Sequence, residues 1–254
     1  MMIIILLCVF VALMLLIGGD RGAISLISLT GNIGVFFLML ILMSWNMNPI
    51  VISAAACIII NGITLLYQNG RNEKTVAALA AVVATMLLLF GVAAFWGYNS
   101  HIAGLNEIEI RSELSLYYNF DIGISMRLVM ISMLLIGMIG AVMDMAIAIT
   151  SAVYEVYQQN SQLTGKELFQ SGITIGKDVL GTTLNTLFFA YIGENMILLL
   201  YLIKYQYAVM DILNSKALLQ ELICILSSGL GCLICIPISA LLASALYTHH
   251  MDAS

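Results

Sequence analysis

A carboxylate lies inside an otherwise apolar segment of this chain. Within GAVMDMAIAITSAVYE, residues 140–155, Asp144 is surrounded by small and apolar residues, and a second carboxylate, Glu155, ends the stretch. A charge near the centre of a bilayer costs about 2.5–3.5 kcal/mol, so it needs a partner, a proton, an ion or water. The stretch therefore predicts either a cation or proton site, or an aspartic acid held protonated as a hydrogen-bonded link between helices.

The residues around Asp144 predict a helix with one small, polar face. On a helix, residues at spacings of three or four lie on the same side. Met, Ile, Leu and Val occupy the other sides, so we expect the glycines to pack against a neighbouring helix and the carboxylates to point into a bundle. The residues of this face are Gly137, Gly140, Asp144, Ala148, Ser151 and Glu155.

The next apolar segment predicts a second polar face, formed by Asp178, Thr182 and Asn185 with Gly181 beside them. The two helices are expected to be antiparallel neighbours. At 1.5 Å per residue, Asp144 lies about 16 Å along its helix from Glu155, and Asn185 lies about 10 Å from Asp178. Asp144 and Asn185 are therefore predicted to meet at similar depth.

These depths suggest distinct roles for the polar residues. Asp144 and Asn185 are predicted to form the core of an ion-binding or substrate-binding site, to which Ser151 and Thr182 add oxygen ligands. A gate or ion-pair cluster is predicted near the cytoplasmic surface, formed by Glu155, Lys177 and Asp178. The glycines predicted to serve helix packing are Gly137, Gly140 and Gly181.

The composition identifies the elements that must position these residues. The chain has 254 residues, of which 62% are hydrophobic and 9% are charged, whereas soluble domains carry about 25% charged residues. We therefore expect an all-α polytopic transmembrane bundle of about seven helices, forming a single transmembrane domain over residues 1–254. Seven runs are long enough to span a bilayer: 2–18, 24–45, 50–67, 75–97, 126–150, 178–203 and 222–247.

Several classes of function are disfavoured. The net charge of −5 without a basic run argues against nucleic-acid binding. No phosphate loop occurs, so the chain is not expected to be its own ATPase. No cofactor motif or metal constellation is recognisable, and the identity of any metal stays unknown. An intramembrane aspartyl hydrolase using Asp144 and Asp178 ranks last, because the predicted depths separate them, and the chain is not expected to be an enzyme.

Two other segments leave alternatives open. NEIEIRSELSLY, residues 106–117, alternates apolar and charged residues, which predicts a strand. That strand either folds over the helix ends of its own chain or pairs with a β-edge of another protein. YIGEN, residues 191–195, interrupts the sixth run. It predicts either a discontinuous helix that exposes backbone groups to a substrate or a simple kink.

Three motifs carry a resemblance: YQNGRNEKTVAALAA at 67–81, LLIGMIGAVMDMAIAITSAVYE at 134–155, and ELFQSGITIGKDVLGTTLNTLFFAYIG at 167–193. With them the chain resembles the YibE/F family of bacterial multispanning membrane proteins, and in length it is similar to the shorter, F-type members. The resemblance implies a multi-pass protein of the bacterial cytoplasmic membrane with a suspected transport function. It also implies an E-type partner that carries an extracytoplasmic domain.

The resulting functional prediction is a permease-like subunit of a membrane transport complex with an acidic cation or proton site. The alternative is a structural or assembly subunit whose polar face binds a partner helix. The expected partners are the lipid bilayer and either an E-type protein or further copies of the chain.

Overall fold

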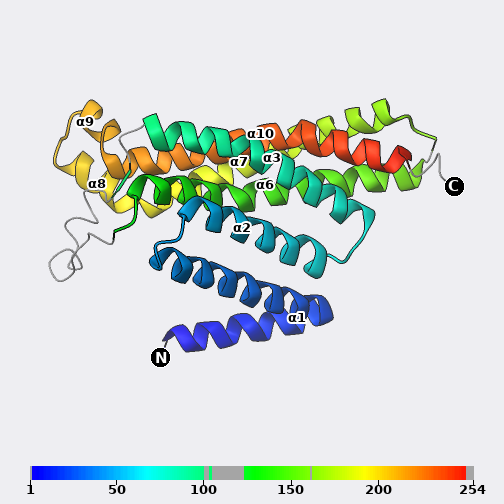
Figure 1. The fold of residues 1–254 in the computed structure, drawn as a ribbon, viewed down its shortest axis with the longest axis horizontal. Helices are drawn as coiled ribbons and strands as arrows, with labels where there is room; N and C mark the ends of the chain where they lie inside the picture. The colour runs from blue at the N-terminus through cyan, green and yellow to red at the C-terminus, as the bar shows by residue number, and fades with distance from the viewer. Residues whose placement is uncertain (1, 100–102, 105–122, 161, 250–254) are drawn as a thin grey trace.

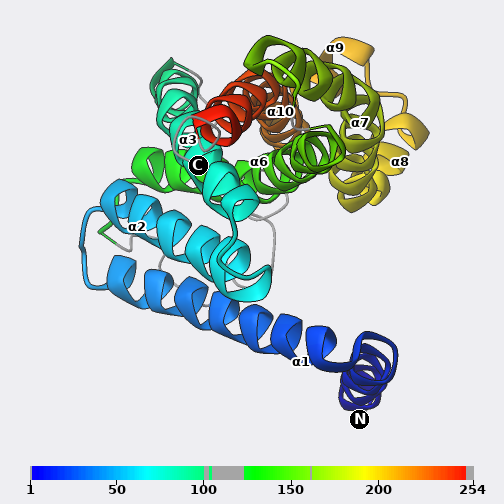
Figure 2. The ribbon, with the colours of Figure 1, turned by 90° about the vertical axis from the view of Figure 1, so that its right-hand side faces the viewer.

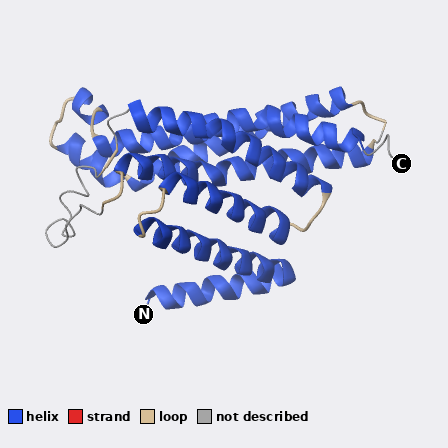
Figure 3. Cartoon of the chain, in the orientation of Figure 1, coloured by secondary structure: helices blue, strands red, loops and turns tan. Residues whose placement is uncertain are grey.

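The computed structural model describes residues 2–99, 103–104, 123–160 and 162–249. All regular secondary structure in these ranges is helical (Figure 3). The predicted strand at 106–117 lies outside the described residues.

Four long helices form the central bundle. These are α3 (Glu73–Asn99), α6 (Met126–Gln159), α7 (Gly165–Glu194) and α10 (Lys216–His249), and they lie side by side along the long axis of the molecule (Figures 1 and 2). Their shared core is apolar and fully enclosed, because every helix turns a stripe of branched or small side chains inward. Fully buried members include Val82, Leu89, Leu134, Met138 and Ile149.

α1 (Met2–Ser44) contains two helical halves that meet at Gly19. Gly19 has φ +53°, a conformation that glycine adopts without steric cost. A Cβ at Gly22 would collide with the backbone of Met14, so the bend also needs a residue without a side chain there. The halves correspond to the predicted runs 2–18 and 24–45, and Figure 2 shows the sharp bend between them.

The second half of α1 packs on α2 (Pro49–Gly62) and on the π-helix η1 (Ile63–Gln68) that continues it. Two side-chain hydrogen bonds join these elements. Asn32 Nδ2 donates to Thr64 Oγ1 at 2.9 Å, and Gln68 Nε2 donates to Ser25 Oγ at 3.1 Å. In an apolar environment such bonds fix the rotation of one helix against another.

The lengths and composition of the helices confirm an all-α polytopic membrane bundle. Five described helices are long and apolar enough to cross a membrane: α1, α2 with η1, α3, α6 and α10. A sixth span arises if α7 and α8 (Met196–Lys204), which meet at a bend of 60°, are one broken span. A short helix, α9 (Val209–Leu213), precedes α10. The interruption predicted from YIGEN is thus present as the α7–α8 break.

α7 begins at Gly165 rather than at residue 178 as predicted. A capping box starts it: Glu167 N donates to Thr164 Oγ1 at 3.4 Å, and Thr164 N donates to Glu167 Oε2 at 2.8 Å. The sequence TGKE has the spacing of such a box. Hydropathy missed this part of the helix because its first turns are polar and extend past the apolar stretch.

Two glycines of α7 set its approach to the bundle. A Cβ built on Gly172 would lie 2.7 Å from Ala240 Cβ, and one built on Gly176 would lie 2.5 Å from Ile236 Cγ2. Neither distance is tolerated by a real side chain, so α7 and α10 are in contact at both positions because the residues there are glycines. The motif GITIG supplies the small-xxx-small spacing typical of close helix packing in membranes.

The glycines predicted to pack are different ones, and two of them make no contact with the described part of the chain. A Cβ on Gly140 or Gly181 would meet no heavy atom within 4 Å. Gly137 has one such neighbour, the hydroxyl of Tyr191 at 3.4 Å. The close contacts of α7 within the chain are made instead at the small-xxx-small pair Gly172 and Gly176.

Substituting Gly176→Ala should therefore lower the stability of the folded chain by about 1–3 kcal/mol, because the added methyl group overpacks the α7–α10 contact. Gly140→Ala is the matched control: it adds the same methyl group into open space within a helix, where alanine is favoured by up to about 1 kcal/mol. Thermal unfolding of both variants in detergent micelles measures the difference. Equal melting temperatures would contradict the packing described here.

Candidate functional site

The contacts between α6 and α7 fix their relative register. A Cβ on Gly172 would lie 3.0 Å from Val153 Cγ2, and one on Gly176 would lie 3.3 Å from Ile149 Cδ1. Each step of four residues along α7 thus corresponds to four residues backwards along α6. The two helices are antiparallel neighbours, as predicted.

The register places the predicted polar residues at definite depths. Tyr191 OH donates to the carbonyl oxygen of Gly137 at 3.5 Å and extends the same pairing to the other end of the helices. Interpolated between these contacts, Asp144 lies level with about Gly181, and Asn185 lies about one turn, or about 6 Å, further along. Asp144 and Asn185 are therefore at similar depth.

The polar faces do not point into the bundle, which corrects the prediction. Asp144 is exposed on α6, and Asp178, Thr182 and Asn185 are exposed on α7. The prediction failed because α6 turns apolar residues such as Val142 and Ile149 toward the core and α7 turns Gly172 and Gly176 there, rather than their carboxylates.

The exposed polar side chains differ in whether they form hydrogen bonds within the chain. Thr182 Oγ1 donates to the Val179 carbonyl at 2.8 Å, so its hydroxyl bonds within its own helix. Asp144, Asp178 and Asn185 make no side-chain hydrogen bond or ion pair with any described residue. These three side chains are thus unsatisfied within the described chain, and such groups are costly wherever they face lipid.

One side of α7 lies next to α6, and some of the exposed polar residues of α7 lie on this side. Ser171 and Ile175 line a surface groove together with Val156 of α6. Asp178 and Thr182 follow them at helical spacing and so lie on the same side. We call Asp144, Asp178, Thr182 and Asn185 the acidic seam: exposed oxygen and amide groups of α6 and α7 that lie within about one turn of Asp144 in depth. Asp144 lies about 140° around α6 from Ile149, which contacts α7, so similar depth rather than direct contact relates Asp144 to the groups of α7.

The depth difference between Asp144 and Asp178 is smaller than predicted. The register places Asp178 level with about Ile147, within one turn of Asp144. No hydrogen bond joins the two carboxyl groups within the described structure. A shared proton of the kind that aspartyl hydrolases use requires such contact, so this arrangement lacks the defining geometry of that class.

The predicted gate cluster is not assembled. Glu155 lies level with about Gln170, so about 10 Å of helix separates it from Lys177 and Asp178. Lys177 lies on the side of α7 that carries Leu184, which contacts α10 at Gly229, whereas Asp178 lies on the α6 side. Ser151 is half-buried about two turns from Asp144 and adds no ligand to it.

Sequence reasoning missed a buried polar row on α10 that holds this helix against α6. Cys232 Sγ donates to the Ala141 carbonyl at 3.8 Å, Cys235 Sγ donates to the Val142 carbonyl at 3.5 Å, and Cys235 Sγ lies 3.2 Å from Ser239 Oγ. The sequence signal for this row was the spacing of Cys232, Cys235 and Ser239, which places all three on one face of α10. The two thiols thus serve as interhelical contacts immediately next to Asp144.

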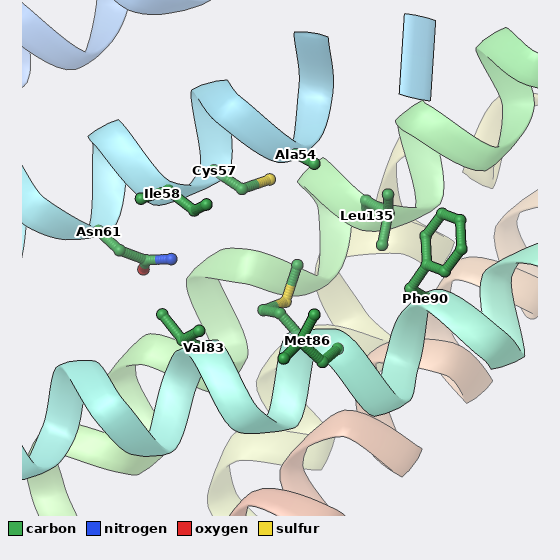
Figure 4. A pocket seen from close by; sticks show the side chains of 9 residues that line it. Ala54, Cys57, Ile58, Asn61, Val83, Met86, Phe90 and Leu135 are labelled. Carbon is green, nitrogen blue, oxygen red and sulfur yellow. The ribbon is translucent and has the colours of Figure 1, made fainter. Parts of the chain in front are cut away.

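An apolar cavity lies elsewhere in the described part of the chain, between α2, α3 and α6 (Figure 4). It has a volume of about 120 Å³ and a lining that is apolar except for Asn61, whose Oδ1 is buried without a hydrogen-bond partner among the described residues. It contains no charged residue, so it does not suit a cation. Its lining is Ala54, Cys57, Ile58, Asn61, Val83, Met86, Leu87, Phe90 and Leu135.

The donor set of the acidic seam restricts its ligands. Within the described residues, no group of three or more His, Cys, Asp and Glu side chains is arranged to hold a metal ion. Carboxylate, hydroxyl and amide oxygens favour protons and hard cations over soft transition metals.

The fold and the acidic seam together define a multi-pass all-α membrane protein with an acidic outer surface at membrane depth. The sequence model described as YibE/F-like protein matches residues 6–249, so the chain belongs to the YibE/F-like family. No curated protein and no solved structure matches the chain.

The exposure of Asp144 leads to a stability prediction. Asp144→Leu should leave the melting temperature of the detergent-solubilised chain unchanged or raise it, because the carboxyl group makes no bond that the variant would lose. Tyr247→Phe is the comparison: it removes the buried hydrogen bond from Tyr247 OH to the Thr150 carbonyl, 3.1 Å long, and should cost about 1 kcal/mol. A larger loss for Asp144→Leu than for Tyr247→Phe would mean that Asp144 is a hydrogen-bonded link between helices.

Proposed function

We propose that the chain is a permease-like subunit of a membrane transport complex in a bacterial cytoplasmic membrane, and that its acidic seam carries a proton or a small cation. The observation that supports this most directly is the position of Asp144. It lies in the middle of a 34-residue apolar helix, without a hydrogen bond or ion pair among the described residues, and at a depth similar to that of the polar groups of α7.

The energetic cost of an ionised Asp144 in lipid supports a cycle in which this carboxylate binds and releases a proton or a cation. An ionised carboxylate at membrane depth is disfavoured by about 2.5–3.5 kcal/mol, whereas protonation or an associated cation removes the net charge. Asp144 is therefore a group whose energy changes strongly when it gains or loses a proton or cation. Thr182 and Asn185, within about one turn in depth, supply further oxygen atoms for a cation.

The α7–α8 break offers a second line of support. Transport proteins commonly use discontinuous helices whose exposed backbone groups contact the transported species. Here the helix breaks after Glu194 with a bend of 60°, and Asn195 lies at the bend. At the break, the Asn195 N–H donates to the Ile192 carbonyl at 3.1 Å, a shorter-range bond than the α-helical one.

The test is calorimetric binding of protons and of Na⁺, K⁺ and Mg²⁺ to the purified full-length protein at several pH values. Wild type should bind or release one ion or proton per chain, and Asp144→Asn should lose that signal, because an amide cannot ionise. Glu155→Gln is the matched control, since it neutralises an exposed acid on the same face of the same helix and should retain the signal. Identical titrations for wild type and Asp144→Asn would remove Asp144 from the mechanism.

The outward direction of the polar residues favours a second candidate, an assembly subunit. Asp144, Asp178 and Asn185 are exposed rather than enclosed, as expected of a helix face that binds another membrane protein. This function predicts that Asp144→Asn leaves activity intact, whereas Gly140→Leu, which fills the open space on the same face of α6, separates the complex. Co-purification of an E-type partner with the two variants distinguishes the candidates.

A further inference from the structure

The outer face of α7 is polar, small and without a partner among the described residues. Gly172 and Gly176 mark the side of α7 that packs on α10 and α6. The opposite side carries a stripe at helical spacing, and all four of its members are exposed: Gln170, Thr174, Gly181 and Asn185. Gln170 and Thr174 also line the surface groove that Val156 of α6 borders, whereas Gly181 and Asn185 do not. Gly181 is open, with no atom within 4 Å of a built Cβ, so a second helix can approach the backbone of α7 there.

Two opposite charges flank this stripe. Asp178 continues the row of Ser171 and Ile175, which adjoins α6, so it lies on the α6 flank. Lys177 lies seven residues, or about two turns, before Leu184 and so is on the same side of α7. Leu184 contacts α10, so Lys177 lies on the α10 flank. Adjacent residues of a helix are about 100° apart, which is why these two charges fall on opposite flanks at one depth. Neither forms an ion pair with the described part of its own chain.

This arrangement is self-complementary under two-fold symmetry. Copies of one membrane protein insert in the same orientation, so two copies of α7 can meet as parallel helices around an axis along the membrane normal. Such an axis brings the α10 flank of one helix opposite the α6 flank of the other. Lys177 of each copy then lies opposite Asp178 of the other, as charges on the two flanks of a coiled-coil seam do.

We propose that the chain forms a homodimer through the outer face of α7, with the two Gly181 residues at the helix crossing and two reciprocal Lys177–Asp178 ion pairs. The pairing removes these charges from contact with lipid. It also brings Lys177 of the second copy to the α6 flank, where the acidic seam lies. The dimer does not rest on the proposed transport function, because no step of the argument uses cation binding.

Disulfide trapping in native membranes tests the crossing. In a Cys8→Ser background, which removes the exposed cysteine of α1, Gly181→Cys and, separately, Thr174→Cys should cross-link copies of the chain under mild oxidation. The matched control is Leu87→Cys on α3: Leu87 is 72% exposed, and its neighbour Leu89 meets Gly231 together with Val142, which places it within about a turn of Gly181 in depth. Cross-linking of both α7 variants at or below the yield of the α3 control would overturn the dimer.

Charge exchange tests the ion pairs independently. Lys177→Asp or Asp178→Lys alone places like charges opposite one another, and each should lower the dimer fraction of the purified full-length protein by about tenfold or more. The double variant Lys177→Asp with Asp178→Lys restores opposite charges and should restore the dimer. Light scattering after size-exclusion chromatography gives the mass, and unchanged melting temperatures show that the variants fold.

Two results would overturn the proposal: a monomeric wild type, which would leave the outer face of α7 to a different protein, or single reversals that dimerise as well as wild type. Asp144 is unchanged in all of these variants. A failure of the dimer is therefore distinguishable from a failure of the cation site, which is tested separately with Asp144→Asn.

Discussion

The close contact of Gly172 and Gly176 with α10 is the interaction on which the rest of the structure depends. Because two glycines in one face of α7 admit Ala240 and Ile236, α7 is fixed in rotation as well as in position. The same two glycines meet Val153 and Ile149 of α6, which sets the register between α6 and α7. The rotation turns the charges of α7 outward, and the register brings Asp178 and Thr182 to the depth of Asp144. The acidic seam follows from packing on the opposite face.

An outward polar face changes what kind of unit the chain is. In water, polar residues on the surface need no explanation, whereas in lipid the costly groups are the exposed polar ones. α6 presents Asp144 and α7 presents Lys177, Asp178 and Asn185 on the outside of the bundle, while thiols and hydroxyls such as those of Cys235 and Ser239 are enclosed. In this chain the polar groups that have no partner among the described residues therefore lie on the outside of the bundle.

Much of the fold could be predicted from the sequence, because apolar runs of membrane length leave few alternatives to helices. Asp144 could also be identified as unusual, because a carboxylate within such an apolar run is costly in lipid. The direction of its side chain could not, since helical periodicity shows which residues share a face but not whether that face meets protein or lipid. Two features had local signals that hydropathy overlooks: the capping box at Thr164 and the glycine pair in GITIG. The register of α6 against α7 had no local signal, because it depends on contacts between distant residues.

The polarity of α7 also has a consequence for the order of biosynthesis. α7 alone is not apolar enough to count as a span and becomes one only together with α8. Its glycine face is completed by α10, which is synthesised after it, whereas α1, α3 and α6 are apolar enough to enter lipid unaided. α7 therefore completes its packing only after α10 has been synthesised, although it precedes α10 in the chain.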